Sequence, residues 1–214
     1  MTAHTEELAD VYGAKSPEEA RAIYNQWSDS YDADNLSRGF RLPSLGAGLA
    51  ARYLGSEAGP ILDACCGTGL VGETLKLLGY DRLTGCDISP DMLAAARKTG
   101  CYEDLREADL GQPLPFEAGT FAGFVCVGAF GPGHAPPVSL EHLVQVTKPG
   151  GYGVFNLIEA SYEAQGFPEV MDRLSGSGSW RIAHVTKPFL PFLLAEPDLW
   201  SRAYVVQISG RAGI

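Results

Sequence analysis

The sequence predicts an α/β protein with a doubly wound, mostly parallel sheet of seven strands and a helical cap at the N-terminus. Between residues 61 and 157, apolar segments of strand length alternate with segments of helical periodicity. Such alternation is typical of parallel sheets built by right-handed crossovers. Two more strand-like segments, 180–185 and 200–208, follow near the end of the chain, and we expect them to form an antiparallel C-terminal hairpin at one edge of the sheet.

Length and composition indicate one domain with a small appendage. The 214 residues are 45% hydrophobic, enough to bury one full core. We expect residues 1–41 to form an N-terminal helical cap or lid and residues 42–214 to form the core, with 160–179 as an insertion on the substrate side. The net charge of -10 argues against a nucleic-acid partner, because such binding depends on Lys and Arg neutralising phosphates.

The sequence shows no targeting, membrane or metal-binding pattern. No apolar run approaches the roughly 18 residues of a membrane span, and residues 1–10 lack the regions of a signal peptide, so we expect a cytoplasmic protein without a membrane partner. Five cysteines occur without a CxxC pair. We interpret them as small buried packing residues in a reducing compartment, with no metal and no disulfide framework. An oligomeric state is not predicted.

Helix signals dominate the first part of the chain. The capping box at 16–19, with proline at the first helical position, predicts a helix over 17–28. The turn formers in 28–35 predict an irregular exit from it. A second helix is expected over 42–54, closed by Gly55 and with larger side chains at four-residue spacing: Leu45, Leu49 and Tyr53.

The stretch 61–87 combines a buried strand, a glycine turn, a helix and a second strand. The first strand stops at Asp63, the turn contains Gly67 and Gly69, and a helix over 70–78 follows. The second strand, 83–86, ends at Asp87. This order is typical of a crevice that binds a nucleoside.

The rest of the chain continues the alternation. Ser89 caps a helix that Gly100 ends, and the run 121–127 reads as a central strand covered on both faces. The remaining expected segments are a third strand (105–108), a Gly/Pro-rich loop (128–137), a helix (139–147), a tight turn (148–151), a fifth strand (152–157), a broken helix (160–174) and a flexible turn (175–179).

Two nucleoside sites fit the glycine turn. Gly67, Gly69 and Gly72 match the spacing GxGxxG, and Asp87 follows the second strand, so an NAD-dependent oxidoreductase is one interpretation. Asp63 argues against it, because a carboxylate next to the turn would repel a pyrophosphate. It would favour a cationic ligand. S-adenosylmethionine is such a ligand, with a sulfonium, an ammonium and an adenosine but no phosphate.

The stretch resembles motif I of the class I S-adenosylmethionine-dependent methyltransferases, an apolar strand and an acid before a GxGTG-like turn. The resemblance continues through the acid Asp87, the pair at 109–110 and the KPGG at 148–151. Residues 24–32, YNQWSDSYD, are similar to the segment before the core of the Williams-Beuren-region methyltransferase-like proteins. The resemblance implies a Rossmann-like methyltransferase sheet, S-adenosylmethionine as the cofactor and methyl transfer as the activity.

Five residues on the adenosine side receive roles from this resemblance. Asp87 would hold both ribose hydroxyls, and Ile88 and Met92 would flank the adenine. Asp109 and Leu110 would meet its exocyclic amine and ring edge. The alternative for Asp87 is an acid that only stabilises a helix N-terminus.

The methionine side of the cofactor would be held by residues from three segments. We expect contacts from the backbone of Gly67 and Gly69, from Asp63, Cys65 and Val127, from a lid of Trp27 and Tyr31, and from Arg41 at the carboxylate. Packing is the alternative for the two aromatic residues, a strand-end hydrogen bond for Asp63, and a solvated charge for Arg41. Cys65 stands where the family commonly has its first turn glycine, so we expect ordinary backbone geometry there.

Methyl transfer from a sulfonium is an in-line displacement and needs no nucleophile on the enzyme. His134, in the loop after the fourth strand, is the candidate base, with substrate binding or packing as its alternatives. The acceptor site is expected to include Phe130, His134, Asn156 and the segment 160–174. We expect a small-molecule acceptor. The rival interpretations are a noncatalytic scaffold that binds S-adenosylmethionine and the NAD-dependent oxidoreductase.

Overall fold

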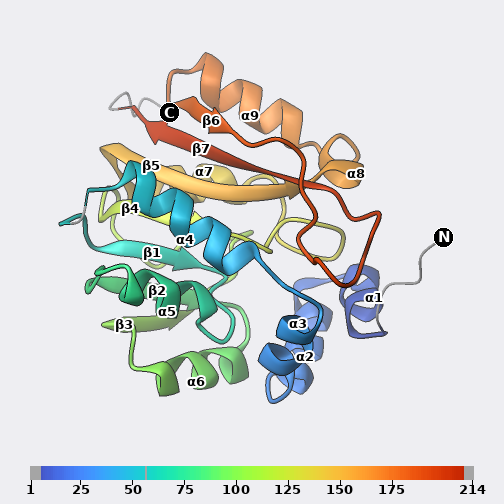
Figure 1. The fold of residues 1–214 in the computed structure, drawn as a ribbon. Helices are drawn as coiled ribbons and strands as arrows, with labels where there is room; N and C mark the ends of the chain where they lie inside the picture. Colours follow the sequence, from blue (N-terminus) through green and yellow to red (C-terminus); the bar gives the residue numbers. More distant parts are fainter. Residues whose placement is uncertain (1–5, 56, 210–214) are drawn as a thin grey trace.

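The computed structural model describes residues 6–55 and 57–209. Figure 1 shows a twisted central sheet between two layers of helices, with three more helices gathered at one end. The sheet has seven strands in the order β3-β2-β1-β4-β5-β7-β6. The strands are β1 (Ile61–Ala64), β2 (Leu83–Asp87), β3 (Asp104–Glu107), β4 (Phe121–Cys126), β5 (Thr147–Ile158), β6 (Trp180–Val185) and β7 (Ser201–Ile208).

Strand pairing confirms the predicted fold class. β1 pairs in parallel with β2 and β4, β2 with β3, and β4 with β5. β7 runs antiparallel between β5 and β6, so the C-terminal hairpin closes one edge of the sheet as expected. The strand order reverses between β1 and β4. In open α/β sheets, ligands bind at such a switch point, outside the carboxyl ends of the strands.

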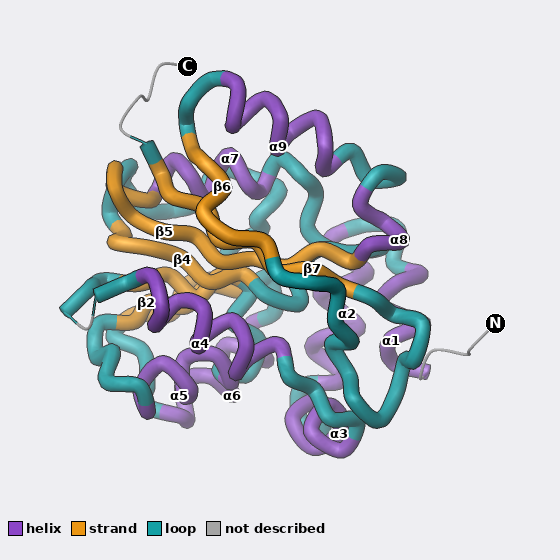
Figure 2. Tube along the Cα trace, turned by 45° about the horizontal axis from the view of Figure 1, so that its top comes forward, coloured by secondary structure: helices purple, strands orange, loops and turns teal. Residues whose placement is uncertain are grey.

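The described helices form two layers and an end cap. They are α1 (Glu6–Gly13), α2 (Pro17–Trp27), α3 (Tyr31–Ser37), α4 (Leu42–Tyr53), α5 (Leu70–Leu77), α6 (Pro90–Thr99), α7 (Ser139–Val146), α8 (Glu159–Tyr162) and α9 (Phe167–Gly176). α4, α5 and α6 cover one face of the sheet, and α7 and α9 cover the other. α1, α2 and α3 lie together at one end, as Figure 2 shows from a second direction.

The central strand β4 carries much of the core. Phe124 and Val125 are fully buried on its two faces, in two separate apolar clusters. The neighbouring strand makes room for the larger side chain, because a Cβ at Gly153 would lie 2.1 Å from the Phe124 ring. The interpretation of this segment as a strand buried on both faces is confirmed.

The irregular exit predicted over residues 28–35 is wrong, because α3 begins at Tyr31. The turn between the helices is short. Asp34 accounts for this, since its carboxylate accepts hydrogen bonds from the Trp27 indole (2.8 Å) and from the Ser30 hydroxyl (2.7 Å). These bonds link the end of α2 to the first turn of α3. Residues that favour turns on their own are therefore held in a helix by side-chain hydrogen bonds, which helix propensity does not take into account.

Helix α4 meets the sheet with its small residues. Leu42, Gly46, Ala47 and Ala50 are buried, whereas the side chains at the four-residue spacing noted in the sequence are only partly buried. A Cβ at Gly46 would approach the Val127 side chain to 3.0 Å, so the helix axis lies close to the sheet. The helix ends with Leu54 as its C-cap, one residue before the expected Gly55.

The tight turn predicted at 148–151 is also wrong, because these residues belong to β5. Thr147 already pairs with Phe121, and the register then shifts before Tyr152 pairs with Gly123. Gly150 has a φ of 82°, so the extra residues are absorbed in an irregular stretch of the strand. α9 likewise extends to Gly176, into the turn expected at 175–179.

The described residues include no helix long and apolar enough to cross a membrane. The expected cytoplasmic location rests on the sequence and stays a prediction. Residues 1–5 of the expected cap and 210–214 of the expected core lie outside the described residues.

Candidate active site

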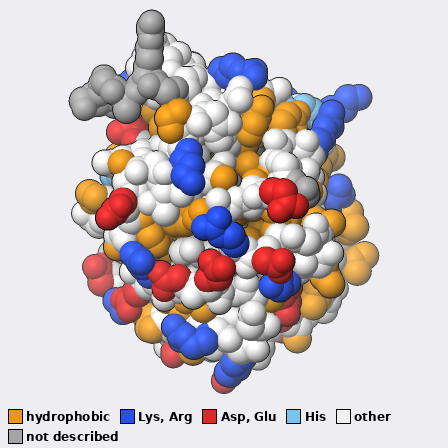
Figure 3. Space-filling view, turned by 90° about the vertical axis from the view of Figure 1, so that its left-hand side faces the viewer, with side chains coloured by type: hydrophobic (Ala, Val, Ile, Leu, Met, Phe, Trp, Pro, Cys, Tyr) orange, Lys and Arg blue, Asp and Glu red, His pale blue; other side chains and the backbone are white. Residues whose placement is uncertain are grey.

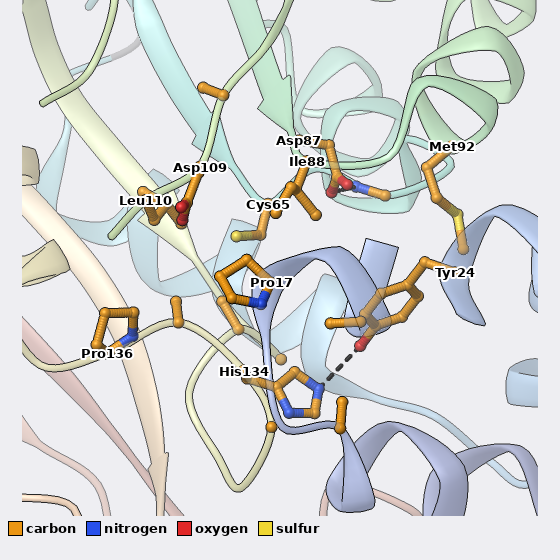
Figure 4. A pocket seen from close by; sticks show the side chains of 18 of the residues that line it. Pro17, Tyr24, Cys65, Asp87, Ile88, Met92, Asp109, Leu110, His134 and Pro136 are labelled. Carbon is orange, nitrogen blue, oxygen red and sulfur yellow. Dashed lines mark hydrogen bonds between the residues drawn. The ribbon is translucent and has the colours of Figure 1, made fainter. Parts of the chain in front are cut away.

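A cavity of about 350 Å³ lies at the carboxyl ends of β1, β2 and β4. The strand ends form one side of it, and the segment from Ala14 to Tyr24 together with Tyr31 forms the other. Figure 4 shows side chains from both sides pointing toward the same space. The cavity therefore lies at the switch point of the sheet, between the core and the helical cap.

The turn after β1 forms part of this cavity. Cys65 has a φ of 56° and Gly67 a φ of 53°, both in the left-handed region. The expectation of ordinary backbone geometry at Cys65 is wrong, and left-handed geometry costs a non-glycine residue about 1–2 kcal/mol. A hydrogen bond with Cys126 and burial raise the pKa of the Cys65 thiol well above its usual range. The thiol is thus a neutral group lining the cavity (Figure 4).

Asp87, the last residue of β2, is held by two backbone amides. Its Oδ1 accepts from the amide of Ser89 and its Oδ2 from the amide of Gly67, both at 2.9 Å. Burial raises the pKa of Asp87, and the amide hydrogen bonds oppose that shift. Each carboxylate oxygen has two lone pairs, so both can accept another hydrogen bond from a ligand. The geometry suits a pair of neighbouring hydroxyl groups.

The next side of the cavity is apolar with one further acid. Ile88 and Met92 follow Asp87. Leu110, beside Asp109 in the loop after β3, lines the same cavity from the other side of Cys65 (Figure 4). Oδ1 of Asp109 accepts a hydrogen bond of 2.8 Å from the amide of Gly111. A flat ring would thus find apolar contacts on its faces and a carboxylate at its edge.

Asp63 does not reach this cavity. It is 2% exposed, and its Oδ2 accepts a hydrogen bond of 2.6 Å from the Tyr102 hydroxyl. Burial raises the pKa of Asp63 to about 7, although the bond from Tyr102 opposes the shift. A Cβ at Gly72 would lie 2.3 Å from the Tyr102 oxygen, so this glycine makes room for the tyrosine. Asp63 thus makes a strand-end hydrogen bond, but its partner is the distant Tyr102 and not the turn after β1.

Two more of the predicted cofactor residues lie elsewhere. Gly69 is the N-cap of α5, with a φ of 105°, and packs against Thr99 and Tyr102. The Arg41 guanidinium stacks 5.6 Å from the centre of the Phe189 ring and lines neither of the cavities described here. Neither residue lines the cavity at the strand ends.

The cap closes the cavity with a hydrogen bond between Tyr24 and His134. The Tyr24 hydroxyl lies 2.8 Å from Nε2 of His134, and Nδ1 of His134 lies 2.6 Å from the carbonyl oxygen of Pro132 (Figure 4). Because a carbonyl can only accept, Nδ1 carries the proton and Nε2 accepts from Tyr24. Removal from water lowers the pKa of His134 below its ordinary value, so the ring is neutral.

Other contacts attach α2 and α3 to the core. The Ser89 hydroxyl donates to Asn25 at 2.6 Å, and the Thr68 hydroxyl donates to Asp32 at 2.5 Å. A salt bridge joins Arg21 to Glu107 at the end of β3. The cap is thus bound to the turn after β1 and to the edge formed by β2 and β3.

A second, smaller cavity of about 50 Å³ adjoins the first one under the cap. Trp27, Phe130 and Asn156 line it, together with His134. The Asn156 amide is fixed, because its Oδ1 accepts from the amide of Gly128 (2.7 Å) and its Nδ2 donates to Ser201 (2.9 Å). The expected acceptor residues therefore come together, and Trp27 lies with them instead of in the larger cavity.

The segment 160–174 lines neither of these cavities. Its Phe167 packs against Phe130, with ring centres 5.3 Å apart, so it supports the second cavity from behind.

Sequence reasoning missed Tyr24 and the 14–17 segment as cavity residues. Tyr24 belongs to the aromatic stripe of its helix, and that pattern does not distinguish a packing tyrosine from one that lines a site. The small residues of the larger cavity that were also missed have no chemical signature: Ala108, Gly128, Ala129, Gly133 and Ala135. Within 6–55 and 57–209 there is no cluster of three or more side chains able to hold a metal ion.

The chain is similar to known methyltransferases in sequence and in fold. Residues 61–151 match the family described as "Methyltransferase domain". Methyltransferase-like protein 27 of Homo sapiens is 36% identical over 74% of this chain and 66% of its own length. The 18S rRNA (guanine(1575)-N(7))-methyltransferase of Saccharomyces cerevisiae is 42% identical over 32% of this chain and 25% of its own length.

A chain in the complex of the Haloferax volcanii Trm112 methyltransferase activator with a methyltransferase superposes with a TM-score of 0.67. It is 18% identical and the match covers 87% of this chain and 97% of that one. At this identity the likeness shows the fold alone. The chain spans 66% of the length of the human relative and a quarter of that of the yeast relative.

Proposed function

Because this chain belongs to the class I S-adenosylmethionine-dependent methyltransferases, with S-adenosylmethionine as its cofactor, we propose that it transfers the cofactor's methyl group to a small-molecule acceptor. The observation that carries the proposal is the pair of adjoining cavities. The larger one ends on the fixed carboxylate of Asp87, and the smaller one lies beside it under the cap.

The charges around the larger cavity fit S-adenosylmethionine better than a dinucleotide. Asp87 and Asp109 line it, and Lys15 is the one Lys or Arg side chain among its described lining residues. A pyrophosphate would need several cationic or amide donors. Asp63 does not line the cavity, so it does not contribute to this charge. The carboxylates of Asp87 and Asp109 do, and they favour a cationic ligand over a pyrophosphate. The NAD-dependent alternative therefore lacks the donors it requires.

The shared lining of one cavity supports the cofactor contacts that the family resemblance implies. Asp87 accepts from both ribose hydroxyls, Ile88 and Met92 hold the adenine faces, and Asp109 accepts from the exocyclic amine. Cys65, Gly67, Leu110, Val127 and Tyr31 line the remaining surface. When bound, S-adenosylmethionine supplies an electrophilic methyl group on a cationic sulfur.

Residues 1–41 act as the lid in this proposal. Their described part carries Tyr24 and Tyr31 over the larger cavity and Trp27 over the smaller one. In-line transfer requires the donor and acceptor to be aligned and kept from water. A lid bound to the core through Asn25 and Asp32 supplies that alignment. The remainder, 42–214, is the single core domain.

Three features favour a small-molecule acceptor. The chain has a net charge of -10, whereas affinity for RNA comes largely from basic residues. On the face opposite the cap, acidic and basic side chains are interspersed, without a basic patch (Figure 3). The acceptor side is also a small cavity under the cap.

RNA is the second candidate acceptor, because the yeast relative acts on guanine in 18S rRNA. That match covers about a third of this chain. Purified protein with methyl-labelled S-adenosylmethionine should label the small-molecule fraction of a cell extract. Label in the RNA fraction alone would favour the second candidate. Tight cofactor binding with no transfer to either fraction would favour the noncatalytic scaffold.

A further inference from the structure

The two cavities meet at one point of the molecule. Tyr24, Tyr31, Gly128 and His134 line both of them. A side chain that lines both the cofactor cavity and the acceptor cavity lies near the point where the methyl group would be transferred. The Tyr24–His134 hydrogen bond therefore lies where an acceptor atom would approach the methyl group.

The second cavity is lined without a single charged side chain among the described residues. Aromatic rings dominate it, including Tyr12, Trp27, Phe40 and Phe192. A carboxylate or ammonium group placed there would lose its hydration and find no partner of opposite charge. Uncharged rings or alkyl groups, in contrast, gain from leaving water and from contact with aromatic faces.

One polar side chain that lines this cavity belongs to Asn35. It is 1% exposed, and its Nδ2 donates to the carbonyl oxygen of Tyr31 at 2.8 Å. The amide oxygen of an asparagine accepts hydrogen bonds, so Asn35 is suited to a ligand that brings an O–H or N–H group.

His134 has the properties of a base at the same place. The Pro132 carbonyl fixes its proton on Nδ1, which leaves the lone pair of Nε2 facing Tyr24. The rings of Tyr12 and Tyr24 contact it. The other titratable side chains that line the two cavities with it are Lys15, Tyr31, Cys65, Asp87 and Asp109. Neutral imidazole can take a proton, and the Tyr24 hydroxyl can pass one on, because it both accepts and donates.

We infer that the acceptor is a small uncharged hydroxyl compound with an aromatic or apolar body, and that its proton leaves through Tyr24 to Nε2 of His134. As the acceptor oxygen forms its bond to the methyl carbon, the sulfur–methyl bond breaks and its electron pair stays on sulfur. The acceptor proton moves to the Tyr24 oxygen while the tyrosine proton moves to His134. The resulting imidazolium releases the proton to water. This inference rests on the proposed methyl transfer.

The tautomer of His134 and its hydrogen bond with Tyr24 can be measured in the free protein, without a methyl-transfer assay. In nitrogen-15 NMR of the free protein, His134 should show the Nδ1–H tautomer and a pKa below 6.5, with assignment from His134→Asn. Tyr24→Phe should raise that pKa, because it removes a hydrogen bond to the neutral ring. Tyr53→Phe is the matched control, since Tyr53 lies on α4 beside Tyr152 and His184. An Nε2–H tautomer, or no response to Tyr24→Phe, would overturn the relay.

The acceptor class is tested with three single-ring probes. With S-adenosylmethionine present, phenol should be methylated, and benzoate and N,N-dimethylaniline should not be. Tyr24→Phe and His134→Asn should each lower kcat on phenol at least tenfold at saturating S-adenosylmethionine, and His184→Asn should leave kcat unchanged. A preference for the anion or the tertiary amine, or rejection of all three probes by protein that binds the cofactor, would overturn the inference. Failure to bind the cofactor at all would instead refute the proposed function.

Discussion

Replacing Asp87 tests the assignment of the larger cavity. In Asp87→Ala, the cofactor would lose the carboxylate that we propose as the acceptor for its ribose hydroxyls. Hydrogen bonds to charged groups contribute about 1.5–3 kcal/mol, so the affinity for S-adenosylmethionine should fall by roughly 10- to 150-fold. The substitution also leaves the amides of Gly67 and Ser89 without their acceptor. Each buried unpaired amide costs about 1–3 kcal/mol, so the Tm should fall too.

The assay is a calorimetric titration with S-adenosylmethionine at a temperature well below the Tm of the variant. Asp91→Ala is the matched control, because Asp91 is an exposed acid in the first turn of α6 that does not line the cavity. It should leave affinity unchanged and cost at most about 1 kcal/mol of stability. A folded Asp87→Ala protein with the affinity of the unchanged protein would refute the assignment of Asp87 to the ribose.

Three further predictions concern the core, a buried acid and the cap. Phe124→Ala should lower the free energy of unfolding by about 3–5 kcal/mol in denaturant titrations, whereas a loss below 1 kcal/mol would contradict the description of the core. The pKa of Asp63 is raised to about 7, so its protonated form is favoured by folding and its contribution to stability falls as pH rises from about 4 to 7. Asp63→Asn should remove that part of the pH dependence of the Tm, and an identical pH profile would show that Asp63 does not titrate in this range. Asn25→Ala removes the acceptor of the Ser89 hydroxyl and should speed cofactor release in stopped-flow experiments, and an unchanged rate would mean that this contact does not hold the lid.

Local patterns predicted the core of the fold well. The strand, turn and acid of 61–87 are signalled by neighbours in sequence, and the structure has them at the expected places. Helices α2 and α6 begin where expected, directly after the N-cap residues Ser16 and Ser89. Both signals depend on residues within a few positions of each other, so a single sequence contains them.

Several of the errors have a common physical cause, which is a partner far away in the sequence. Asp63 is turned to Tyr102, 39 residues later, and no local pattern indicates that bond. Tyr24 finds His134 across 110 residues. Cys65 holds a left-handed conformation because the surrounding turn, including the bond from the amide of Cys66 to the carbonyl of Cys86, fixes it there.

Five residues predicted to bind the cofactor are supported by their positions in the structure. Asp87, Ile88, Met92, Asp109 and Leu110 come from three separate segments and line one cavity. Their roles in binding S-adenosylmethionine stay predictions. Arg41 and Gly69 are not part of that surface, since packing against Phe189 and Tyr102 occupies them.

The central claim is that this chain binds S-adenosylmethionine and transfers its methyl group. The most direct measurement is the transfer of a labelled methyl group from S-adenosylmethionine to the small-molecule fraction of an extract, with Asp87→Ala run beside the unchanged protein. We predict a labelled product whose formation, at limiting cofactor, falls at least tenfold in the variant. Label that is absent with the unchanged protein, or equally strong with the variant, would contradict the account.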